Sequence, residues 1–256
     1  MIAYVDGDVC LYRIGFVTEN ETEESAISSL DLYLDEILTE VNAKEYKIFL
    51  SCSREDNFRL KYNHEYKANR PERKPTHFKA LKQHLLDKHN ALVGVTEEAD
   101  DLIGIAQYKD PDGSIGVTND KDILYGVVGH KYNCVTKNFN YNSPEEATKY
   151  FYRQLLMGDR TDNIDGIYGL GKAKSLKIVE HLETEEDLFL EVQNQYRMWL
   201  AKEWKIPDIQ NWTNFNEKQM NNIILMNGIQ LKIREHEGQV WHFPIDVSQE
   251  VNPVLD

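Results

Sequence analysis

The chain is poor in the features that mark secreted and membrane proteins. Its 256 residues include only three cysteines, Cys10, Cys52 and Cys134, an odd number without regular spacing. That usage argues against a disulfide scaffold and suits a reducing, cytoplasmic environment. No apolar run approaches the roughly 18 residues of a membrane span, and the start MIAYVDGD lacks the basic and apolar regions of a signal peptide. We therefore expect a cytoplasmic protein with no membrane partner.

Positive charge is also scarce, with 29 Lys and Arg against 43 Asp and Glu and a net charge of −14. At first sight this argues against a nucleic-acid partner. The distribution of charge argues the other way, because residues 59–89 carry nine Lys or Arg against three acids. Tyr62 and Tyr66 interleave with those charges, a pattern typical of channels in which bases of a single strand stack on rings. The alternative is a solvated basic surface.

Hydrophobic patterning predicts an α/β domain followed by helices. Apolar runs that read as strands and periodic segments that read as helices alternate over the first 160 residues. The expected strands are 2–5, 47–52, 91–95 and 114–118, and the expected helices are 24–42, 96–108 and 144–157, with a further helix that Thr76 caps and that carries Phe78, Leu81, Leu85 and Leu86. This alternation predicts a mostly parallel central sheet flanked by helices over about residues 1–160, and a mostly helical C-terminal part over 161–256.

Nine carboxylates gather in four short clusters, three of which follow expected strands. The clusters are Asp6 and Asp8, then Glu98, Asp100 and Asp101, then Asp120 and Asp122, and finally Asp159 and Asp162. The carboxyl ends of parallel strands meet at one crevice, where so many carboxylates would repel one another. Hard divalent cations relieve that repulsion, so the pattern predicts a multi-magnesium phosphoryl-transfer site. The alternative is that some of these acids only cap helices or form turns.

Two further motifs are suited to binding phosphate. The segment GIYGLGKAKSLKIV, residues 166–179, places glycines at a tight turn before a helix that carries Lys172, Lys174 and Lys177. Backbone N–H groups at such a helix start bind phosphate, although a plain helix corner would also need glycine. In YKANR, Lys67 and Arg70 lie three residues apart and would share a helix face. Such a pair can polarise a phosphate in its transition state.

The order of these motifs, from DGD through NFR, YKANR, EADD and NDKD to GDRTDNIDGIYGLGKAKS, resembles the phage and bacterial 5′→3′ exonuclease and flap endonuclease family. The chain looks most like the phage 5′ exonucleases. The resemblance extends from Asp6 to about Lys177. It implies the PIN-like 5′ nuclease fold, with a basic helical arch at about residues 54–90 and a helix-hairpin that binds DNA at about 163–180.

The resemblance also implies a role for each motif. The first metal site would comprise Asp6, Glu98, Asp100 and Asp101, and the second Asp120, Asp122, Asp159 and Asp162. Lys67 and Arg70 would be the catalytic cations of the arch. The residues implied in DNA binding are Tyr66, Gly169, Gly171, Lys172 and Lys174, and the family's hairpin often holds a potassium ion.

The implied activity is a structure-specific hydrolysis of DNA near 5′ ends. Two or more Mg²⁺ ions, with Mn²⁺ as a substitute, would serve a reaction that leaves a 5′-phosphate and a 3′-hydroxyl. The implied partners are DNA 5′ ends, flaps and nicked or gapped duplexes, with RNA–DNA primers as a further class. The setting would be primer removal in replication, or DNA degradation and recombination, by a monomer in the cytoplasm, the host's if a phage encodes it.

Two positions depart from the family pattern. Cys52 stands at the end of the second strand, where the family usually has an aspartate. A thiol is a poor ligand for Mg²⁺, so water would fill that corner or Asp56 would replace the missing acid, and we favour water. Asp8 is not among the family's usual ligands, and its role is left open as a loop-orienting or outer carboxylate.

Two other functions fit parts of the pattern. A haloacid-dehalogenase-like phosphatase would use Asp6 as nucleophile and Asp8 as general acid, but it leaves EADD, NDKD and the glycine hairpin without a role. A non-catalytic DNA-binding relative of the nucleases would have lost its chemistry at Cys52. The retained carboxylates argue against that function, since without metal they would repel DNA.

Overall fold

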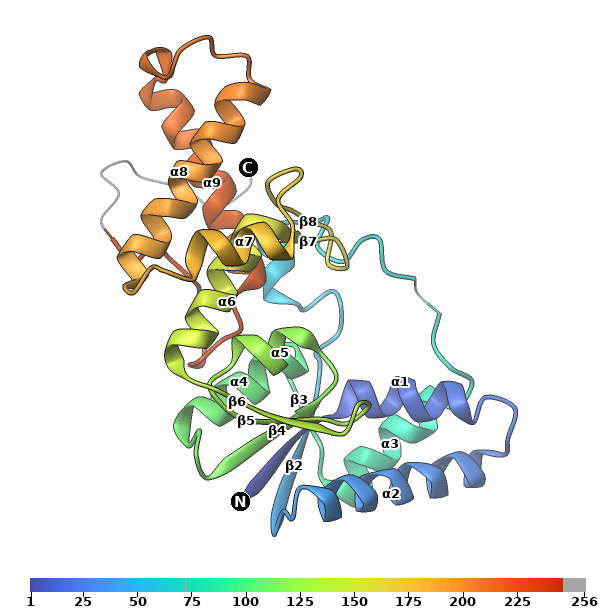
Figure 1. Ribbon diagram of the computed structural model, residues 1–256. Coiled ribbons are helices and arrows are strands. Elements are labelled where there is room, and N and C mark those ends of the chain that lie inside the picture. Colours follow the sequence, from blue (N-terminus) through green and yellow to red (C-terminus); the bar gives the residue numbers. More distant parts are fainter. Residues whose placement is uncertain (72, 246–256) are drawn as a thin grey trace. The chain divides into compact units, whose positions relative to one another are not determined.

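The computed structural model describes residues 1–71 and 73–245, which divide into two compact units (Figure 1). The first unit comprises residues 1–57, 71–144 and 233–239. The second comprises residues 58–70, 145–232 and those from 240 onward. Each unit therefore draws on segments that are distant in sequence. The expected domain boundary near residue 160 stays a prediction.

The first unit is built on a six-stranded sheet in the order β3-β2-β1-β4-β5-β6. The strands are β1 Ile2–Asp6, β2 Glu45–Leu50, β3 Leu92–Val93, β4 Ser114–Thr118, β5 Gly129–Asn133 and β6 Asn138–Asn142. All neighbouring strands are parallel except β6, which pairs antiparallel with β5. The predicted α/β class with a mostly parallel sheet is confirmed.

Helices cover both faces of this sheet (Figure 1). On one face lie α1 Gly7–Val17, α2 Glu23–Glu40 and α3 Phe78–His89, and on the other α4 Ala99–Lys109 and α5 Lys121–Gly126. The first face buries residues such as Leu11, Leu30 and Leu81 against the strands, and the second buries Ile103 and Ile123. Each helix presents an apolar stripe to the sheet, as the sequence period of α2 and α3 predicts.

Helix α1 is absent from our sequence-based assignment, because its start DGDV reads as a loop. Gly7 opens the helix where it passes close to β2, and a Cβ there would lie 2.7 Å from both Leu50 Cδ2 and Phe49 O. Only glycine permits this approach, so the residue that weakens the helical pattern also brings α1 onto the sheet.

The hairpin of β5 and β6 was missed as well, since its residues are mostly polar. Lys131 in β5 is completely buried, and its ammonium donates to the carbonyl oxygens of Val128 and Gly129, each at 3.0 Å. Burial lowers the pKa of Lys131 to about 7. The two carbonyl partners allow Lys131 to occupy a core position, whereas a lysine would ordinarily be expected at the surface.

The second unit is mostly helical. It contains η1 Phe58–Lys61, α6 Pro144–Met157 from its second residue on, the short pair β7 Gly158–Asp159 and β8 Ile164–Asp165, α7 Lys172–Val179, α8 Glu185–Glu203, η2 Ile209–Asn211 and α9 Asn214–Leu231. Its core includes Phe189, Tyr196, Ile224 and Trp241. No helix in the described part of the chain combines the length and apolarity needed to cross a membrane.

Within the expected arch at about residues 54–90, η1 and α3 are helical, but the segment between them is not. Between η1 and α3, the described residues 62–71 and 73–77 contain turns and extended backbone but no helix. Pro71 and Pro75 interrupt the segment, and it lacks the apolar period that would seat a helix. Lys67 adopts a left-handed conformation with φ of 55°. The prediction that Lys67 and Arg70 share a helix face is therefore wrong.

Gly228 provides a test of the packing in the second unit. A Cβ at this position in α9 would lie 2.0 Å from Trp241 Cε3 and 2.2 Å from Cζ3. Alanine would gain about 1 kcal/mol of helix propensity, but overpacking against a buried ring costs about 1–3 kcal/mol. Because the added Cβ would lie only 2.0 Å from the ring, we expect the cost near its upper end, and Gly228→Ala should lower the free energy of unfolding in urea by about 1–2 kcal/mol.

The control is Gly171→Ala, where no atom lies within 4 Å of the added Cβ. It should lower the unfolding midpoint by less than Gly228→Ala does, since it loses only the preference of the N-cap of α7 for glycine over alanine. Equal stability of Gly228→Ala and the parent protein would show that Trp241 does not pack against Gly228 as described.

Candidate metal centre and nucleic-acid interface

The carboxyl ends of β1 and β4 form the switch point of the sheet. β1 lies between β2 and β4 and is parallel to both, and the strands that follow β2 and β4 in the chain extend the sheet in opposite directions. Ligands of open α/β sheets bind at such a reversal, outside the strand ends. Asp6 ends β1 and Thr118 ends β4, so the first and third carboxylate clusters begin at this point.

Asp6 is fixed by hydrogen bonds at both of its oxygens. Oδ1 accepts from the Val9 N–H at 3.1 Å, which caps α1, and Oδ2 accepts from Thr118 Oγ1 at 2.8 Å. Thr118 Oγ1 in turn accepts from the Asp120 N–H at 2.9 Å. A single hydroxyl thus connects two carboxylate clusters. Sequence reasoning gave Thr118 no part in this site, although its position at a strand end directly before NDKD was a usable signal.

Burial and mutual repulsion destabilise the charged forms of Asp6 and Asp8. Burial, the charge of Asp8 and, more weakly, that of Asp120 raise the pKa of Asp6 to about 7. Burial and the nearby charge of Glu98 raise the pKa of Asp8, against hydrogen bonds from Ser51 and the charge of Lys82, which lower it. Asp6, Asp8, Glu98 and Asp120 thus form a chain of electrostatic interactions, in which each acid affects the pKa of a neighbour. Lys82 on α3 is a further cation near this cluster that sequence reasoning did not single out.

Glu98 and Asp101 cap α4 reciprocally. The Glu98 side chain accepts from the Asp101 N–H, and Asp101 Oδ2 accepts from the Glu98 N–H at 3.2 Å. Asp101 Oδ1 accepts from the Arg234 N–H, also at 3.2 Å, and Asp101 is completely buried. Asp101 thus has the capping role that the alternative interpretation gave it. Asp100 lies in the same first turn, and the metal-ligand roles of all three stay predictions.

Cys52 lies among these acids. Burial raises the pKa of its thiol to about 11, and the charges of Glu98, Asp56 and Glu97 add to the effect. The thiol therefore stays protonated at neutral pH. A neutral thiol beside Glu98 agrees with the view that this corner contributes no anionic ligand.

Asp120 begins α5 in the same way as Asp6 begins α1. Its Oδ1 accepts from the Asp122 N–H at 2.7 Å. The Asp122 carboxylate pairs with the Lys121 ammonium at 3.1 Å. The pair Asp120 and Asp122 therefore sits at the start of a helix that leaves the switch point.

In the second unit, three predicted site residues converge on a fourth. Asp162 is buried, and its carboxylate pairs with the Arg70 guanidinium and with Lys67 Nζ at 3.7 Å. Tyr66 donates its hydroxyl to Asp162 Oδ2 at 3.4 Å. Asp159, also buried, ends β7 and accepts from the Thr161 N–H at 2.9 Å. The turn at Lys67, rather than a helix, brings these side chains together.

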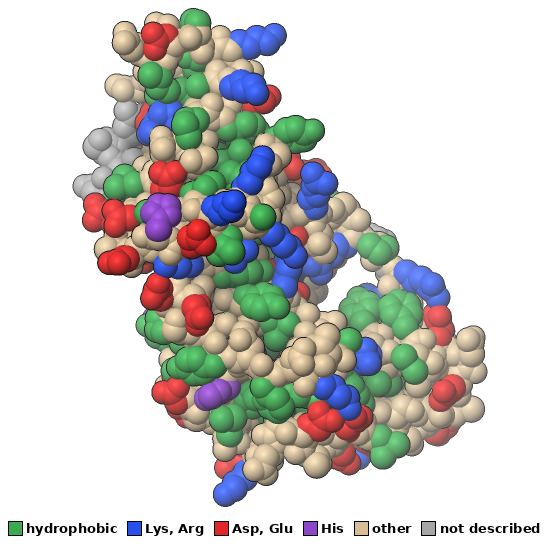
Figure 2. Space-filling model, viewed as in Figure 1, with side chains coloured by type: hydrophobic (Ala, Val, Ile, Leu, Met, Phe, Trp, Pro, Cys, Tyr) green, Lys and Arg blue, Asp and Glu red, His purple; other side chains and the backbone are tan. Residues whose placement is uncertain are grey.

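The glycine hairpin leads into α7 as predicted. Gly169 has φ of +76°, Gly171 is the N-cap of α7, and nothing lies within 4 Å of a Cβ built on either. Lys174 Nζ donates to the Gly169 carbonyl at 3.1 Å, and Lys172 is exposed. Figure 2 shows Lys and Arg side chains gathered over α7 and its surroundings in this unit. Backbone groups are thus accessible to a phosphate at this helix start.

Tyr168 is the side chain in the hairpin that sequence reasoning missed. It is 84% exposed, which is unusual for a large ring. Its place between Ile167 and Gly169 in IYGLG was the available signal, since a ring at a turn before a phosphate-binding helix can stack on a base.

Comparisons with known proteins agree with this geometry. The chain is 24% identical over 271 residues to a 5′-3′ exonuclease of Mycoplasmopsis pulmonis, covering 98% of this chain and 88% of the relative. It is 29% identical over 218 residues to a 5′-3′ exonuclease of Buchnera aphidicola, covering 75% and 74%. The chain is thus similar in sequence to two named 5′-3′ exonucleases. No protein-family model matches it.

This chain has the same fold as solved nuclease structures. The bacteriophage T5 D15 protein, co-crystallised with metal ions, has a TM-score of 0.62 at 18% identity and covers 91% of this chain and 89% of its own. The catalytic core of Rad2 in complex with a DNA substrate has a TM-score of 0.52 at 15% identity, covering 98% and 83%. The PIN-like 5′ nuclease fold expected from the motifs is confirmed, apart from the missing arch helix.

Thr118→Val tests the hydroxyl that links Asp6 and Asp120. Valine keeps the shape but leaves a buried carboxylate oxygen and a backbone N–H without their partner. We expect a loss of about 1.5–3 kcal/mol of unfolding free energy, typical of a hydrogen bond to a charged group. We also expect weaker Mg²⁺ binding in a calorimetric titration.

Thr118→Ser is the matched control, because it keeps the hydroxyl and should retain most of both properties. If valine and serine at this position behave alike, the hydroxyl does not organise the cluster.

Proposed function

We propose that this protein is a Mg²⁺-dependent 5′→3′ exonuclease and flap endonuclease acting on DNA. The observation that carries the proposal is the convergence of Asp6, Asp8, Glu98 and Asp120 at the strand ends of a 5′ nuclease fold. The named exonucleases among its relatives support nuclease activity. The metal-bound and DNA-bound structural neighbours agree with a metal-dependent nuclease that binds DNA.

The donor set of the first unit fits hard divalent ions. The residues that crowd the switch point offer carboxylate oxygens, which Mg²⁺ prefers. Burial and, after it, the charge of Asp8 raise the pKa of Asp6 to about 7, and a bound divalent cation would favour its charged form. When bound, Mg²⁺ would supply charge neutralisation and Lewis-acid activation at the scissile phosphate. The family resemblance places Asp159 and Asp162 with Asp120 and Asp122 in a second metal set, and we retain this as part of the proposal.

The residues of the protein would position the substrate around this chemistry. Lys67 and Arg70, held in place by Asp162, would add positive charge at the phosphate. Gly169, Gly171 and the start of α7, with Lys172 and Lys174, would bind the backbone of the duplex without reading its sequence. The exposed Tyr168 would contact bases near the 5′ end. Tyr66, predicted to bind DNA, is only 3% exposed and donates to Asp162, so its role would be to hold that carboxylate.

The finer features of the proposal come from the family resemblance. They are a product with a 5′-phosphate and a 3′-hydroxyl, a two-metal reaction in which Mn²⁺ can replace Mg²⁺, action on RNA–DNA primers, and a potassium ion at the hairpin. Cutting of flaps, nicks and gaps by a monomer in the cytoplasm belongs to the same proposal.

Labelled oligonucleotides test this function directly. Flap, nicked and blunt substrates carrying a 5′ label should release short 5′ products in the presence of Mg²⁺, and EDTA should abolish the reaction. Asp120→Asn should lose cleavage by at least about 100-fold, in the range seen when charge stabilisation of a transition state is removed, while still retarding DNA in a gel.

Asp112→Asn is the matched control, because Asp112 is an exposed acid of the same unit outside the cluster, and it should cut like the parent protein. Absence of EDTA-sensitive cleavage on all three substrates would exclude the proposed activity. Normal cutting by Asp120→Asn would remove that residue from the metal site.

Cys52→Asp tests the departure from the family pattern. The new carboxylate would lie beside Glu98 and add an oxygen ligand, so we expect retained cleavage at a lower Mg²⁺ requirement. The added charge should also lower stability in the absence of metal, since Glu98, Asp56 and Glu97 already surround this position.

Cys52→Ser is the control, because it replaces the thiol without adding charge, and it should keep the parent's Mg²⁺ requirement. Cleavage and thermal melts over a Mg²⁺ series measure both effects. Loss of cleavage in both variants would show that the thiol itself is required.

A further inference from the structure

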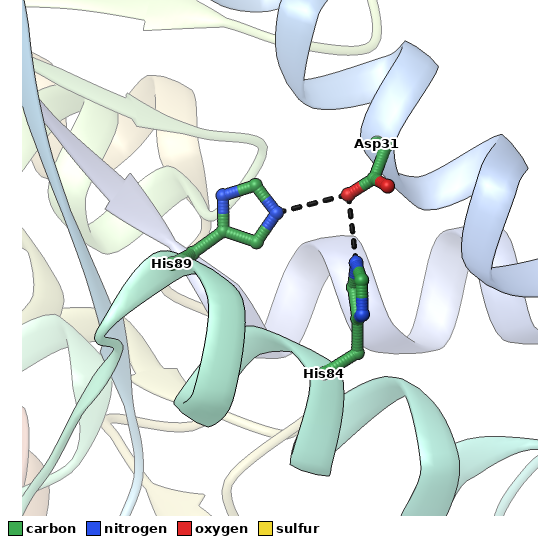
Figure 3. Close-up of side chains that lie close together, drawn as sticks. All are labelled: Asp31, His84 and His89. Carbon is green, nitrogen blue, oxygen red and sulfur yellow. Dashed lines mark hydrogen bonds and ion pairs between the residues drawn. The ribbon is translucent and has the colours of Figure 1, made fainter.

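A second group of metal-binding side chains lies between two helices of the first unit. Asp31 projects from α2, and His84 and His89 project from α3 (Figure 3). Asp31 Oδ1 is 2.8 Å from His84 Nε2 and 2.9 Å from His89 Nε2. The three ligand atoms all lie within 4.8 Å of one another. One carboxylate oxygen thus faces two imidazole nitrogens at the same point.

We propose that Asp31, His84 and His89 bind a zinc ion, independently of the proposed nuclease function. Two imidazoles and one carboxylate are a donor set that suits Zn²⁺ and disfavours Mg²⁺, which requires oxygen ligands. Tetrahedral Zn²⁺ with bonds of 2.0–2.2 Å places its ligand atoms roughly 3.3 Å apart. The two N···O separations are a few tenths of an ångström shorter, and the two imidazole nitrogens lie within 4.8 Å of each other, so the ion would be admitted by rotating both imidazoles about Asp31 Oδ1.

Tyr46 supplies the outer contact that such a histidine needs. Its hydroxyl lies 3.0 Å from His89 Nδ1, on the side of the ring away from Asp31. A ligating histidine binds metal through one nitrogen and gives the N–H of the other to a neighbouring oxygen. With zinc on Nε2, the Nδ1–H would donate to Tyr46 Oη. The ring orientation required for metal binding is therefore already fixed.

The surroundings allow an ion to enter from solvent. The side chains of Asp31, His84 and His89 are 24%, 17% and 9% exposed, so a water molecule can complete the coordination. Partial burial acts to raise the pKa of Asp31, but hydrogen bonds from Lys88, His84 and His89 outweigh it and lower that pKa below its ordinary range. The carboxylate is thus ionised at neutral pH.

One neighbouring cation opposes the ion. Lys88 Nζ lies 2.7 Å from Asp31 Oδ2, the oxygen that does not face the histidines. Its side chain is 56% exposed, so it can move into solvent when zinc binds. Lys88 should therefore weaken zinc binding without preventing it. Bound zinc would clamp α2 to α3.

Zinc titration of the purified, metal-stripped protein tests the site. Millimolar Mg²⁺ is kept present throughout to occupy the carboxylate cluster, and binding is followed by calorimetry. We expect one Zn²⁺ equivalent, a rise in melting temperature on binding, and a tetrahedral Co²⁺ absorption spectrum without thiolate charge transfer when Co²⁺ replaces Zn²⁺.

Variants assign the ion to this cluster. His84→Ala and the more conservative Asp31→Asn should each lose this equivalent, while His181→Ala, which removes an exposed histidine of the second unit, should keep it. Tyr46→Phe should bind about tenfold more weakly, the usual effect of removing an outer-shell partner. Lys88→Ala should bind more tightly. Circular dichroism establishes that each variant is folded.

Two results would overturn the proposal. The first is the absence of stoichiometric zinc binding to the parent protein, which would leave the cluster as a hydrogen-bonded contact between α2 and α3. The second is unchanged binding in folded Asp31→Asn, which would place the ion elsewhere. Either result leaves the nuclease proposal intact, because Mg²⁺-dependent cleavage is measured without zinc.

Discussion

Repulsion between the buried Asp6 and the partly buried carboxylates around it, at the ends of β1 and β4, is the constraint on which the arrangement of the first unit depends. Asp6 is 3% exposed, and burial together with Asp8 raises its pKa to about 7. A cluster of this kind costs stability unless other groups compensate for the charge. The structure compensates in part with hydrogen bonds, since Asp6 accepts from Val9 and Thr118. The negative charge that these hydrogen bonds do not compensate favours the binding of cations.

Helix starts provide the second part of that compensation. Asp6, Glu98 and Asp120 are the N-caps of α1, α4 and α5. The N-terminus of a helix carries partial positive charge from unpaired N–H groups, so three helices direct their favourable ends at the same acids. Capping and metal binding are therefore compatible roles for Asp6, Glu98 and Asp120. The sequence left helix capping and metal binding open as alternatives, and the same residues can do both.

The sequence predicted the parts of the fold that follow simple hydrophobic periods. β1, β4, α2 and α6 lie within two residues of their expected bounds, and the expected mostly parallel sheet is present. The misses have physical causes. In α1, Gly7 fits a close approach to β2 that no local pattern reveals. In β5, Lys131 is stabilised in the core by carbonyls brought there by the fold.

The prediction of a helix through Lys67 and Arg70 was wrong for a related reason. The family resemblance implies a helical arch here, on which Lys67 and Arg70 would share a face, but tertiary contacts govern this segment. Arg59 is buried and donates to the carbonyls of Gln230 and Lys232 at 2.9 and 3.1 Å, and Asp162 holds Lys67 and Arg70. These partners lie about 90 to 170 residues away in sequence. Lys67 and Arg70 therefore lie together at Asp162, but in a turn rather than a helix, and their catalytic role stays a prediction.

An acid outside the family pattern, Asp8, lies near Cys52, where the family resemblance leads us to expect an aspartate. Asp8 is not a usual acid of the family pattern, yet its Oδ2 accepts from the N–H of Ser51, the residue before Cys52. Asp8 and Cys52 both feel the charge of Glu98. A carboxylate from the first turn of α1 thus lies next to the end of β2, where the protonated Cys52 thiol adds no charge. Burial and the charge of Glu98 raise the pKa of Asp8, so a bound cation would favour its charged form and that of its neighbours together.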